Sequence, residues 1–306
     1  MRLASISVDL DEIRHYAEIH AIDGSRLPSR PIYARALPRF LEFFERHQLR
    51  ATFFVIGADL DDEANRALLR EAHERGHEIA SHSETHLYDL TRRDRRTIER
   101  EIDAVAKKIE ELIGRPPIGF RAPGYTVNEA LLEALEERGY MYDSSVFPSA
   151  PYYAAKAAAM AAIRMRGDVS RSVLDHPRVL MAPRHPYRIG QRYTKRGDGL
   201  LELPIATSRL TRAPIIGTFL MMSPPRLAAA LVRSAMDGPH LNLEFHGIDL
   251  ADRDRDGLTA LGGHQPDLRV GLEAKLARFD AVILECRRKG YEFLRLDEAA
   301  HALGSR

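Results

Sequence analysis

Several residue types that would define a class of protein are scarce or missing in this 306-residue chain. A single cysteine, Cys286, excludes an internal disulfide and a zinc site built from cysteines, and it is typical of a reducing compartment. Tryptophan is absent, and no apolar run approaches the roughly 18 residues that a membrane-spanning helix needs. Lys and Arg number 45 against 44 Asp and Glu, so the charge balance gives no indication of a nucleic-acid partner.

The first residues also lack the pattern of a secretory signal. The letters MRLASISVDLDE become acidic at residue 9 and do not continue as an apolar stretch. We therefore predict a cytoplasmic protein, either free in the cytoplasm or located at the inner face of the membrane. A signal that precedes this sequence is the open alternative.

Segments with strand and helix patterns alternate along the chain, which is typical of an α/β protein with a parallel sheet. Seven or eight such units favour a barrel. We predict one domain over residues 1–306, interrupted by an Ala- and Arg-rich insertion at about 149–200. The predicted strands are 3–9, 51–57, 77–82, 118–124, 140–146, 200–206, 213–220, 240–247 and 291–296. The predicted helices are 33–48, 63–76, 94–114, one from about 127 with Thr126 and Glu129 as a capping box, 224–236 and 267–289.

Two acids, Asp9 and Asp11, occupy alternating positions where the first apolar run ends. Positions i and i+2 of an extended chain point to one side, so the two carboxylates repel each other there. A solvated turn is one interpretation, because Asp is common in turns. A cation that relieves the repulsion is the other.

Other ionisable residues follow later predicted strands. His82 and His86 stand four apart after one strand, Arg121 follows the next, and His246 ends a late one. The ends of parallel strands meet at one rim of a barrel, so these groups become neighbours. Two histidines four apart with one Asp form a ligand set for a divalent metal, which favours the cation interpretation. Histidines held by backbone groups are the alternative.

These motifs together resemble the polysaccharide deacetylases of the NodB-homology group, carbohydrate esterase family 4. The matching segments are SVDLDE, HSETH within GHEIASHSETH, FRAPGY, GYMYDSSVFP, and LEFH at residues 243–246. In family order they cover roughly residues 3–148 and 200–300. The resemblance implies a distorted (β/α) barrel of about seven strands that hydrolyses an acyl amide on a sugar with the help of a metal.

The resemblance also implies a role for each matching residue. Asp11, His82 and His86 would hold one divalent ion, with zinc expected before cobalt, nickel or manganese. The remaining roles are these: Asp9 as general base, Arg121 as its ion-pair partner, His246 as general acid, backbone N–H groups near Gly124 and Tyr125 as oxyanion donors, and Leu243 as a wall of the acyl pocket.

The chain departs from the family pattern in two places. Its first motif has a Leu between the acids, and the Asp-Trp motif of typical members is missing, which leaves the partner of His246 open. Asp249 is one candidate for that partner, and an exposed loop acid is the equal alternative. We interpret Glu12, Glu84 and Glu244 as solvated residues or as indirect supports of the site.

The predicted function is removal of an N-acetyl or similar acyl group from an amino sugar, with an intracellular lipid- or nucleotide-linked saccharide as the expected substrate. Hydrolysis of a small cyclic amide or imide on the same fold is the alternative, followed by a carbohydrate-binding protein without catalysis. The sequence leaves the oligomeric state open.

The insertion carries clustered cations that suit an anionic substrate or a peripheral contact with an anionic membrane, whereas a solvated loop is the equal alternative. These cations are Arg164, Arg166, Arg171, Arg178, Arg184, Arg188, Arg192, Lys195 and Arg196. The stretch 154–171 within the insertion has the pattern of an Ala-rich helix, either a lid or a helix packed on the barrel.

Overall fold

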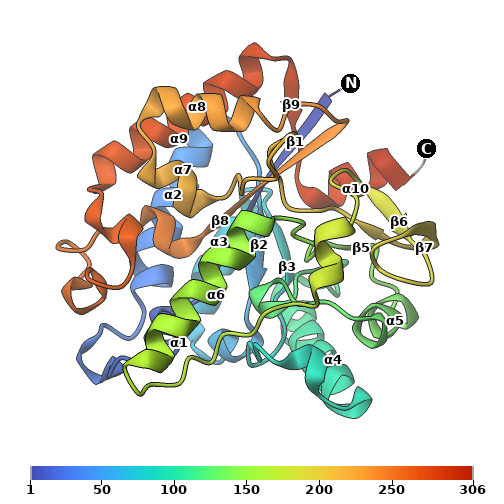
Figure 1. The fold of residues 1–306 in the computed structure, drawn as a ribbon, viewed down its shortest axis with the longest axis horizontal. Coiled ribbons are helices and arrows are strands. Elements are labelled where there is room, and N and C mark those ends of the chain that lie inside the picture. The colour runs from blue at the N-terminus through green and yellow to red at the C-terminus, as the bar shows by residue number, and fades with distance from the viewer. Residues whose placement is uncertain (1, 305–306) are drawn as a thin grey trace.

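Strand β1 (Arg2–Asp9) runs inward from the N-terminal end of the chain in the computed structural model, which describes residues 2–304 (Figure 1). It pairs in parallel with β2 (Thr52–Val55) on one side and with β8 (His240–His246) on the other. The nine-stranded sheet has the order β6-β7-β5-β4-β3-β2-β1-β8, and β9 pairs with the start of β1. The remaining strands are β3 (Glu78–Ser81), β4 (Gly119–Phe120), β5 (Tyr142–Asp143), β6 (Tyr187–Ile189), β7 (Arg196–Glu202) and β9 (Tyr291–Phe293).

Irregular backbone after β7 closes the sheet. The N–H of Ala206 donates to the carbonyl of Asn242 in β8 at 3.0 Å. Further along, Ile216 forms an isolated parallel bridge with Glu244. This segment therefore fills the gap between β7 and β8, and the predicted distorted (β/α) barrel is confirmed. The sheet has nine strands and not seven because β6, which is antiparallel to β7, and the short β9, which pairs with β1, add two.

Helices cover the outside of the barrel, with α2, α7, α8 and α9 gathered on one side and α4 and α5 on another (Figure 1). Helix α6 crosses the front of the molecule in the same view. The helices are α1 (Ile13–His20), α2 (Leu37–Arg46), α3 (Glu63–Glu74), α4 (Arg95–Ile113), α5 (Glu129–Glu137), α6 (Ala150–Met165), α7 (Gly217–Met222), α8 (Pro225–Arg233), α9 (Leu272–Arg288) and α10 (Leu296–Gly304). No helix within residues 2–304 is long and apolar enough to span a membrane.

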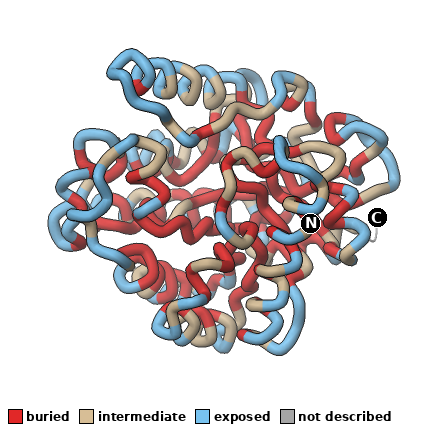
Figure 2. Tube along the Cα trace, turned by 90° about the horizontal axis from the view of Figure 1, so that it is seen from below, coloured by how far each residue is buried: buried red, intermediate tan, exposed pale blue. Residues whose placement is uncertain are grey.

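The two faces of β1 divide the core from the site. Ile6 and Val8 point outward and join the main apolar cluster, which includes Phe279 of α9. Because side chains alternate along a strand, Ser7 and Asp9 point into the barrel instead. Figure 2 shows the buried residues filling the interior of the chain trace. The inner face of β1 is therefore polar, and its outer face is part of the apolar core.

Three predicted elements differ from the structure. Residues 217–222 form α7, although the run 213–220 predicted a strand, because a short apolar stretch has no periodicity that separates the two. Helix α5 is capped by Asn128, which accepts the N–H of Leu131 at 2.9 Å, so the Thr126 capping box is wrong. The predicted insertion contains α6, β6 and most of β7.

Gly119 at the start of β4 packs against a neighbouring strand and supports the position of Arg121. A Cβ on Gly119 would lie 2.1 Å from Cζ of Tyr142, whose hydroxyl donates to Glu78 at 2.9 Å. We expect Gly119→Ala to lower the free energy of unfolding by roughly 1–3 kcal/mol, the usual cost of overpacking a core. Urea denaturation measures this loss. Gly263→Ala is the matched control, since its Cβ would meet nothing within 4 Å, and an equal loss there would contradict the explanation.

Candidate active site

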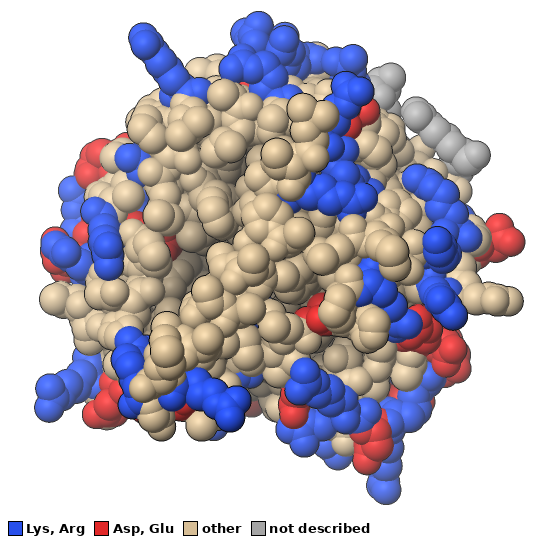
Figure 3. Space-filling model, in the orientation of Figure 1, with Lys and Arg blue, Asp and Glu red and all other residues tan. Residues whose placement is uncertain are grey.

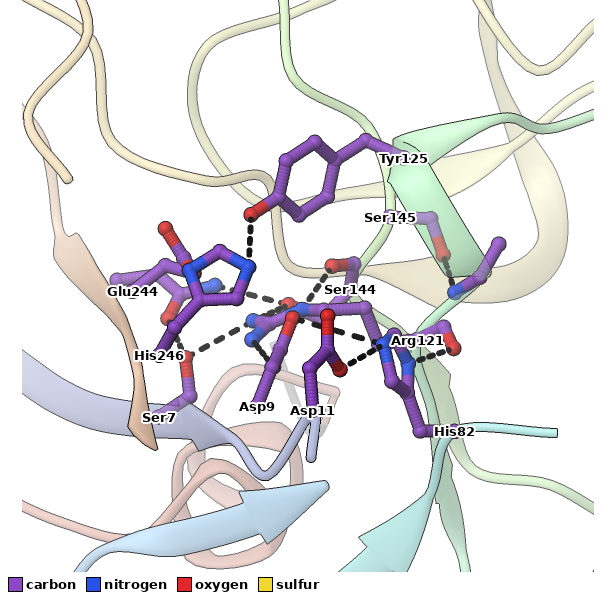
Figure 4. Close-up of polar contacts among 12 residues, drawn as sticks. Ser7, Asp9, Asp11, His82, Arg121, Tyr125, Ser144, Ser145, Glu244 and His246 are labelled. Carbon is purple, nitrogen blue, oxygen red and sulfur yellow. Dashed lines mark hydrogen bonds and ion pairs between the residues drawn. The ribbon is translucent and has the colours of Figure 1, made fainter. Parts of the chain in front are cut away.

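The ends of β1, β3, β4 and β8 bring the predicted site residues together inside one rim of the barrel (Figure 4). Asp9 is the last residue of β1 and lies in register with His246, the last residue of β8. His82 and Arg121 follow β3 and β4, which pair through Ser81 and Phe120. Parallel strands in register thus place groups from four distant parts of the sequence side by side.

Asp11, His82 and His86 form a buried cluster of ligand atoms. Nε2 of His82 lies 3.3 Å from Oδ1 of Asp11, and Nε2 of His86 lies 3.5 Å from Oδ2 of Asp11. One ligand atom from each residue lies within 4.8 Å of the others, and all three residues are buried. Both ring nitrogens of His86 lack a hydrogen-bond partner among the described residues, which costs free energy unless a ligand binds there. Two imidazoles and a carboxylate are suitable zinc ligands, so these residues fit a divalent ion.

The backbone fixes the orientation of the two histidines. Nδ1 of His82 lies 2.7 Å from the carbonyl oxygen of Arg121, which can only accept, so the proton is on Nδ1 and Nε2 is free to bind a metal. His86 is reached through a loop, not a helical turn, because Ser83 and His86 have φ angles of 64° and 56°. Left-handed backbone at residues other than glycine is strained and concentrates at functional sites.

Arg121 is completely buried and holds Asp9 in place. Its guanidinium donates to Oδ1 of Asp9 at 2.6 Å, and it also donates to the hydroxyls of Ser7 at 2.9 Å and Ser144 at 2.8 Å. The ring of Phe54 lies 4.2 Å beneath the guanidinium carbon. Oδ2 of Asp9 has no hydrogen-bond partner among the described residues and lies 3.9 Å from Nε2 of His82. One oxygen of Asp9 is therefore anchored, and the other faces the candidate metal site.

His246 has a partner that the sequence did not identify. Nδ1 of its ring lies 2.8 Å from Oε1 of Glu244, and its Nε2 lies 3.3 Å from the hydroxyl of Tyr125. Asp249, the candidate partner, is buried and accepts the backbone N–H of His246 at 2.8 Å, so it fixes the chain and not the ring. Glu244 and His246 are two apart on β8 and share its inward face, and that alternation was the available signal.

Burial and neighbouring opposite charges shift the pKa values of the site residues in opposite directions. Burial alone would lower the pKa of His246, but the Glu244 carboxylate outweighs it and raises that pKa well above its usual value. Burial alone would raise the pKa of Asp11, but His86 and His82 lower it well below its usual value. For Asp9, burial raises the pKa even though Arg121 and His82 oppose the rise.

The predicted oxyanion donor at Tyr125 and the predicted acyl-pocket wall at Leu243 do not have the expected geometry. The N–H of Tyr125 donates to the carbonyl of Ala122 at 3.0 Å, so it is occupied within a turn, and Tyr125 reaches the site through its hydroxyl. Leu243 lies on the outward face of β8 together with Phe245, because side chains alternate on that strand. The structure does not bring Leu243 to the acyl site. Gly124 has a φ angle of 62°, and its carbonyl accepts a hydrogen bond from Lys156 at 3.1 Å.

The acids that flank the motifs also differ in their surroundings. Glu12 is buried and accepts the N–H groups of Ile13 at 2.7 Å and Ile32 at 3.2 Å, so it is a structural support behind the site. Glu84 pairs with Lys108 at 2.6 Å. Ser7 in β1 and Ser144 directly after β5, which both accept hydrogen bonds from Arg121, were missed because a single serine gives no signal of its own.

Glu244 allows a test of how the protonation of His246 is controlled. We expect Glu244→Gln to lower the pKa of His246 by removing the carboxylate that raises it, so the alkaline limb of the pH profile of kcat/KM moves to lower pH. The pH dependence of kcat/KM measures this shift. Glu84→Gln removes a carboxylate that does not contact His246 and serves as the control. A profile unchanged in Glu244→Gln would show that the pair does not set the pKa.

Comparisons with known proteins agree with this arrangement. Residues 28–142 match the family model described as polysaccharide deacetylase. A peptidoglycan-N-acetylglucosamine deacetylase of Bacillus cereus is 32% identical over 103 residues, which cover 34% of this chain and 46% of that protein. A peptidoglycan deacetylase of Helicobacter pylori is 27% identical over 161 residues, which cover 49% of this chain and 52% of that protein. The chain thus spans about half the length of the curated relatives it matches.

Solved structures share the fold over almost the whole chain. A candidate polysaccharide deacetylase from Mycobacterium smegmatis superposes with a TM-score of 0.63 at 20% identity, covering 99% of this chain and 90% of that one. A family 4 acetyl xylan esterase from Clostridium thermocellum, in complex with a cobalt ion, superposes with a TM-score of 0.51 at 15% identity. The superposition covers 99% of this chain and 91% of that one.

Fold and site together define an α/β barrel with a buried set of candidate metal ligands at one rim. The resemblance to the NodB-homology polysaccharide deacetylases is confirmed, and the chain has the fold of that family. The match over residues 28–142 contains both histidines and Arg121. The individual roles of the site residues stay predictions.

Proposed function

We propose that this protein is a metal-dependent hydrolase that removes an N-acetyl or similar acyl group from an amino sugar. The observation that carries the proposal is the position of Asp9, with one oxygen anchored on Arg121 and the other facing the cluster of Asp11 and two histidines. A general base beside a metal site suits metal-assisted amide hydrolysis, in which a water is deprotonated next to a polarised carbonyl.

The protein residues divide the remaining work. Asp11, His82 and His86 would hold the ion, which supplies an activated water and a Lewis acid for the carbonyl. Asp9 accepts the proton of the attacking water through its free oxygen, while Arg121 fixes the orientation of the carboxylate. His246, oriented by Glu244, donates a proton to the departing amine.

We extend the proposal to the metal and to the substrate. Zinc fits the two imidazoles and the carboxylate, with cobalt, nickel and manganese as the other candidates. An intracellular lipid- or nucleotide-linked saccharide is the proposed substrate, and the cytoplasm, at or near the inner face of the membrane, is the proposed location. The single cysteine supports a reducing compartment.

The test measures acetate release by the zinc-loaded protein from N-acetylglucosamine linked to a diphosphate, with Asp9→Asn as the matched control. We expect turnover by the natural protein and almost none by the variant. Hydrolysis of a cyclic imide such as succinimide, without any acetate release, would replace the proposal by the small-amide alternative. Sugar binding without turnover of either compound would replace it by a binding function.

A further inference from the structure

A cavity of about 610 Å³ adjoins the candidate metal site on the side of His86. Its walls come from α1, from the loop after His86 and from the segment after α6, and His86 itself forms part of the wall. We call this cavity the arginine pocket, after the four arginines that line it: Arg14, Arg92, Arg93 and Arg171.

The charge of the arginine pocket is positive. Its four arginines face two carboxylates in the same walls, those of Glu18 and Asp89. Arg171 pairs with Glu18 at 3.1 Å, and Arg93 pairs with Asp89 at 2.8 Å. Arg14 pairs at 2.5 Å with Asp59, which does not line the pocket, so within residues 2–304 only one of the four arginines is left without a carboxylate partner. Among the described residues, the guanidinium of Arg92 has no hydrogen-bond or ion-pair partner. Arginine forks of this kind bind phosphate oxygens well.

Buried polar groups in the same walls also lack partners. Both ring nitrogens of His15 and the hydroxyl of Tyr88 have no hydrogen-bond partner among the described residues. Their side chains are deeply buried, at 5% and 8% exposure, and their rings lie 4.6 Å from the ring of His86. An unpaired buried polar group destabilises a protein, so these groups indicate a ligand with hydrogen-bonding atoms inside the pocket.

A second cavity of about 550 Å³ continues from the arginine pocket, because Val169 and Ser170 line both. Its other walls are mostly apolar and include Ala157, Met160 and Leu174. Val169 is 84% exposed, and Met165 at the end of α6 is 83% exposed. Figure 3 shows that charged side chains are few on the face crossed by α6 and that Lys and Arg gather toward its margins. We call this cavity the apolar pocket.

We propose that the two pockets bind an isoprenoid-type substrate, a sugar phosphate on a long apolar chain, with the phosphate in the arginine pocket and the chain in the apolar pocket. The inference rests on the proposed function for the identity of the sugar. The spatial sequence of the pockets supports this proposal. From His86 toward α6, the candidate metal ligands are followed first by arginines and then by apolar side chains. Apolar surface next to a phosphate site suits a hydrocarbon chain better than a nucleoside, which has hydrogen-bonding atoms that need partners.

The cations of the predicted insertion differ in position and in ion-pair partners. Arg171 alone among the nine lines the arginine pocket, and Arg164 lines the apolar pocket. Arg178 pairs with Glu129 at 2.7 Å, and Arg184 pairs with Asp237 at 2.9 Å, so these two hold the insertion on the barrel. The cationic surface that faces the pockets is therefore smaller than the sequence indicated, and it includes arginines from outside the insertion.

The test is a calorimetric titration of the zinc-loaded protein with farnesyl diphosphate, inorganic pyrophosphate and uridine diphosphate. We expect farnesyl diphosphate to bind at least about tenfold more tightly than the other two, because about two buried methylene groups supply that factor. The double variant Arg92→Gln/Arg171→Gln should weaken both farnesyl diphosphate and pyrophosphate by at least about tenfold. The double variant Met160→Gln/Leu174→Gln, at two residues that line only the apolar pocket, should weaken farnesyl diphosphate alone.

The control removes the same number of positive charges from a part of the insertion that lies outside both pockets. Arg192 and Lys195 are exposed and line neither pocket, so Arg192→Gln/Lys195→Gln should change each affinity by less than about twofold. Equal losses in the two charge variants would overturn the phosphate site, and uridine diphosphate binding as tightly as farnesyl diphosphate would overturn the lipid assignment. These affinities are measured without catalysis, so failure of the proposed hydrolase activity is seen separately, as absent acetate release.

Discussion

Asp9→Asn is expected to keep the metal and to lose activity by a factor on the order of a hundred or more. The amide retains the shape of the side chain but cannot take a proton from water. Asp9 touches Arg121 at 2.6 Å with one oxygen, and its other oxygen is the unpartnered atom that faces the metal cluster. The measurement pairs kcat for acetate release with metal content by elemental analysis.

Asp11→Asn is the matched comparison for that result, because both variants replace a buried aspartate two residues apart with its amide. Asp11 lies 3.3 Å and 3.5 Å from the two histidine nitrogens, so its variant should bind metal more weakly. If both variants lose the same amount of metal, the roles of base and ligand have been divided wrongly.

Removal of either histidine is expected to abolish both metal binding and turnover. His82→Ala and His86→Ala each delete one of three candidate ligands in a buried cluster, and two remaining ligands hold a divalent ion poorly. Zinc content after dialysis and acetate release by the same samples provide the two readouts.

His77→Ala is the control for the histidine variants, because this buried histidine accepts the N–H of Ala51 at 3.0 Å and precedes β3, whereas His82 follows the other end of that strand. It should keep its zinc. Full zinc occupancy in both His82→Ala and His86→Ala would contradict the assigned site.

The residues at the strand ends could be identified from sequence patterns alone. Asp9, Asp11, His82, Arg121 and His246 each follow an apolar run that reads as a strand, and the ends of parallel strands meet at one rim. Local periodicity and one rule of topology were enough to predict the barrel and the grouping of acids and histidines at its rim. The choice of Asp11 as the ligand and Asp9 as the base came from the family resemblance and stays a prediction.

The tertiary structure alone decided how those residues are paired and what surrounds them. Asp9 and Arg121 are 112 positions apart, and no local pattern states that one guanidinium reaches one carboxylate oxygen. Leu243 was assigned to the acyl pocket by the family resemblance, although it is three residues from His246 on one strand and therefore points to the opposite face. Likewise, only packing shows that Arg171 of the insertion and Arg92 of a distant loop line one pocket. Periodicity is encoded within a few residues, whereas side-chain partners depend on contacts between segments that the chain brings together only when it folds.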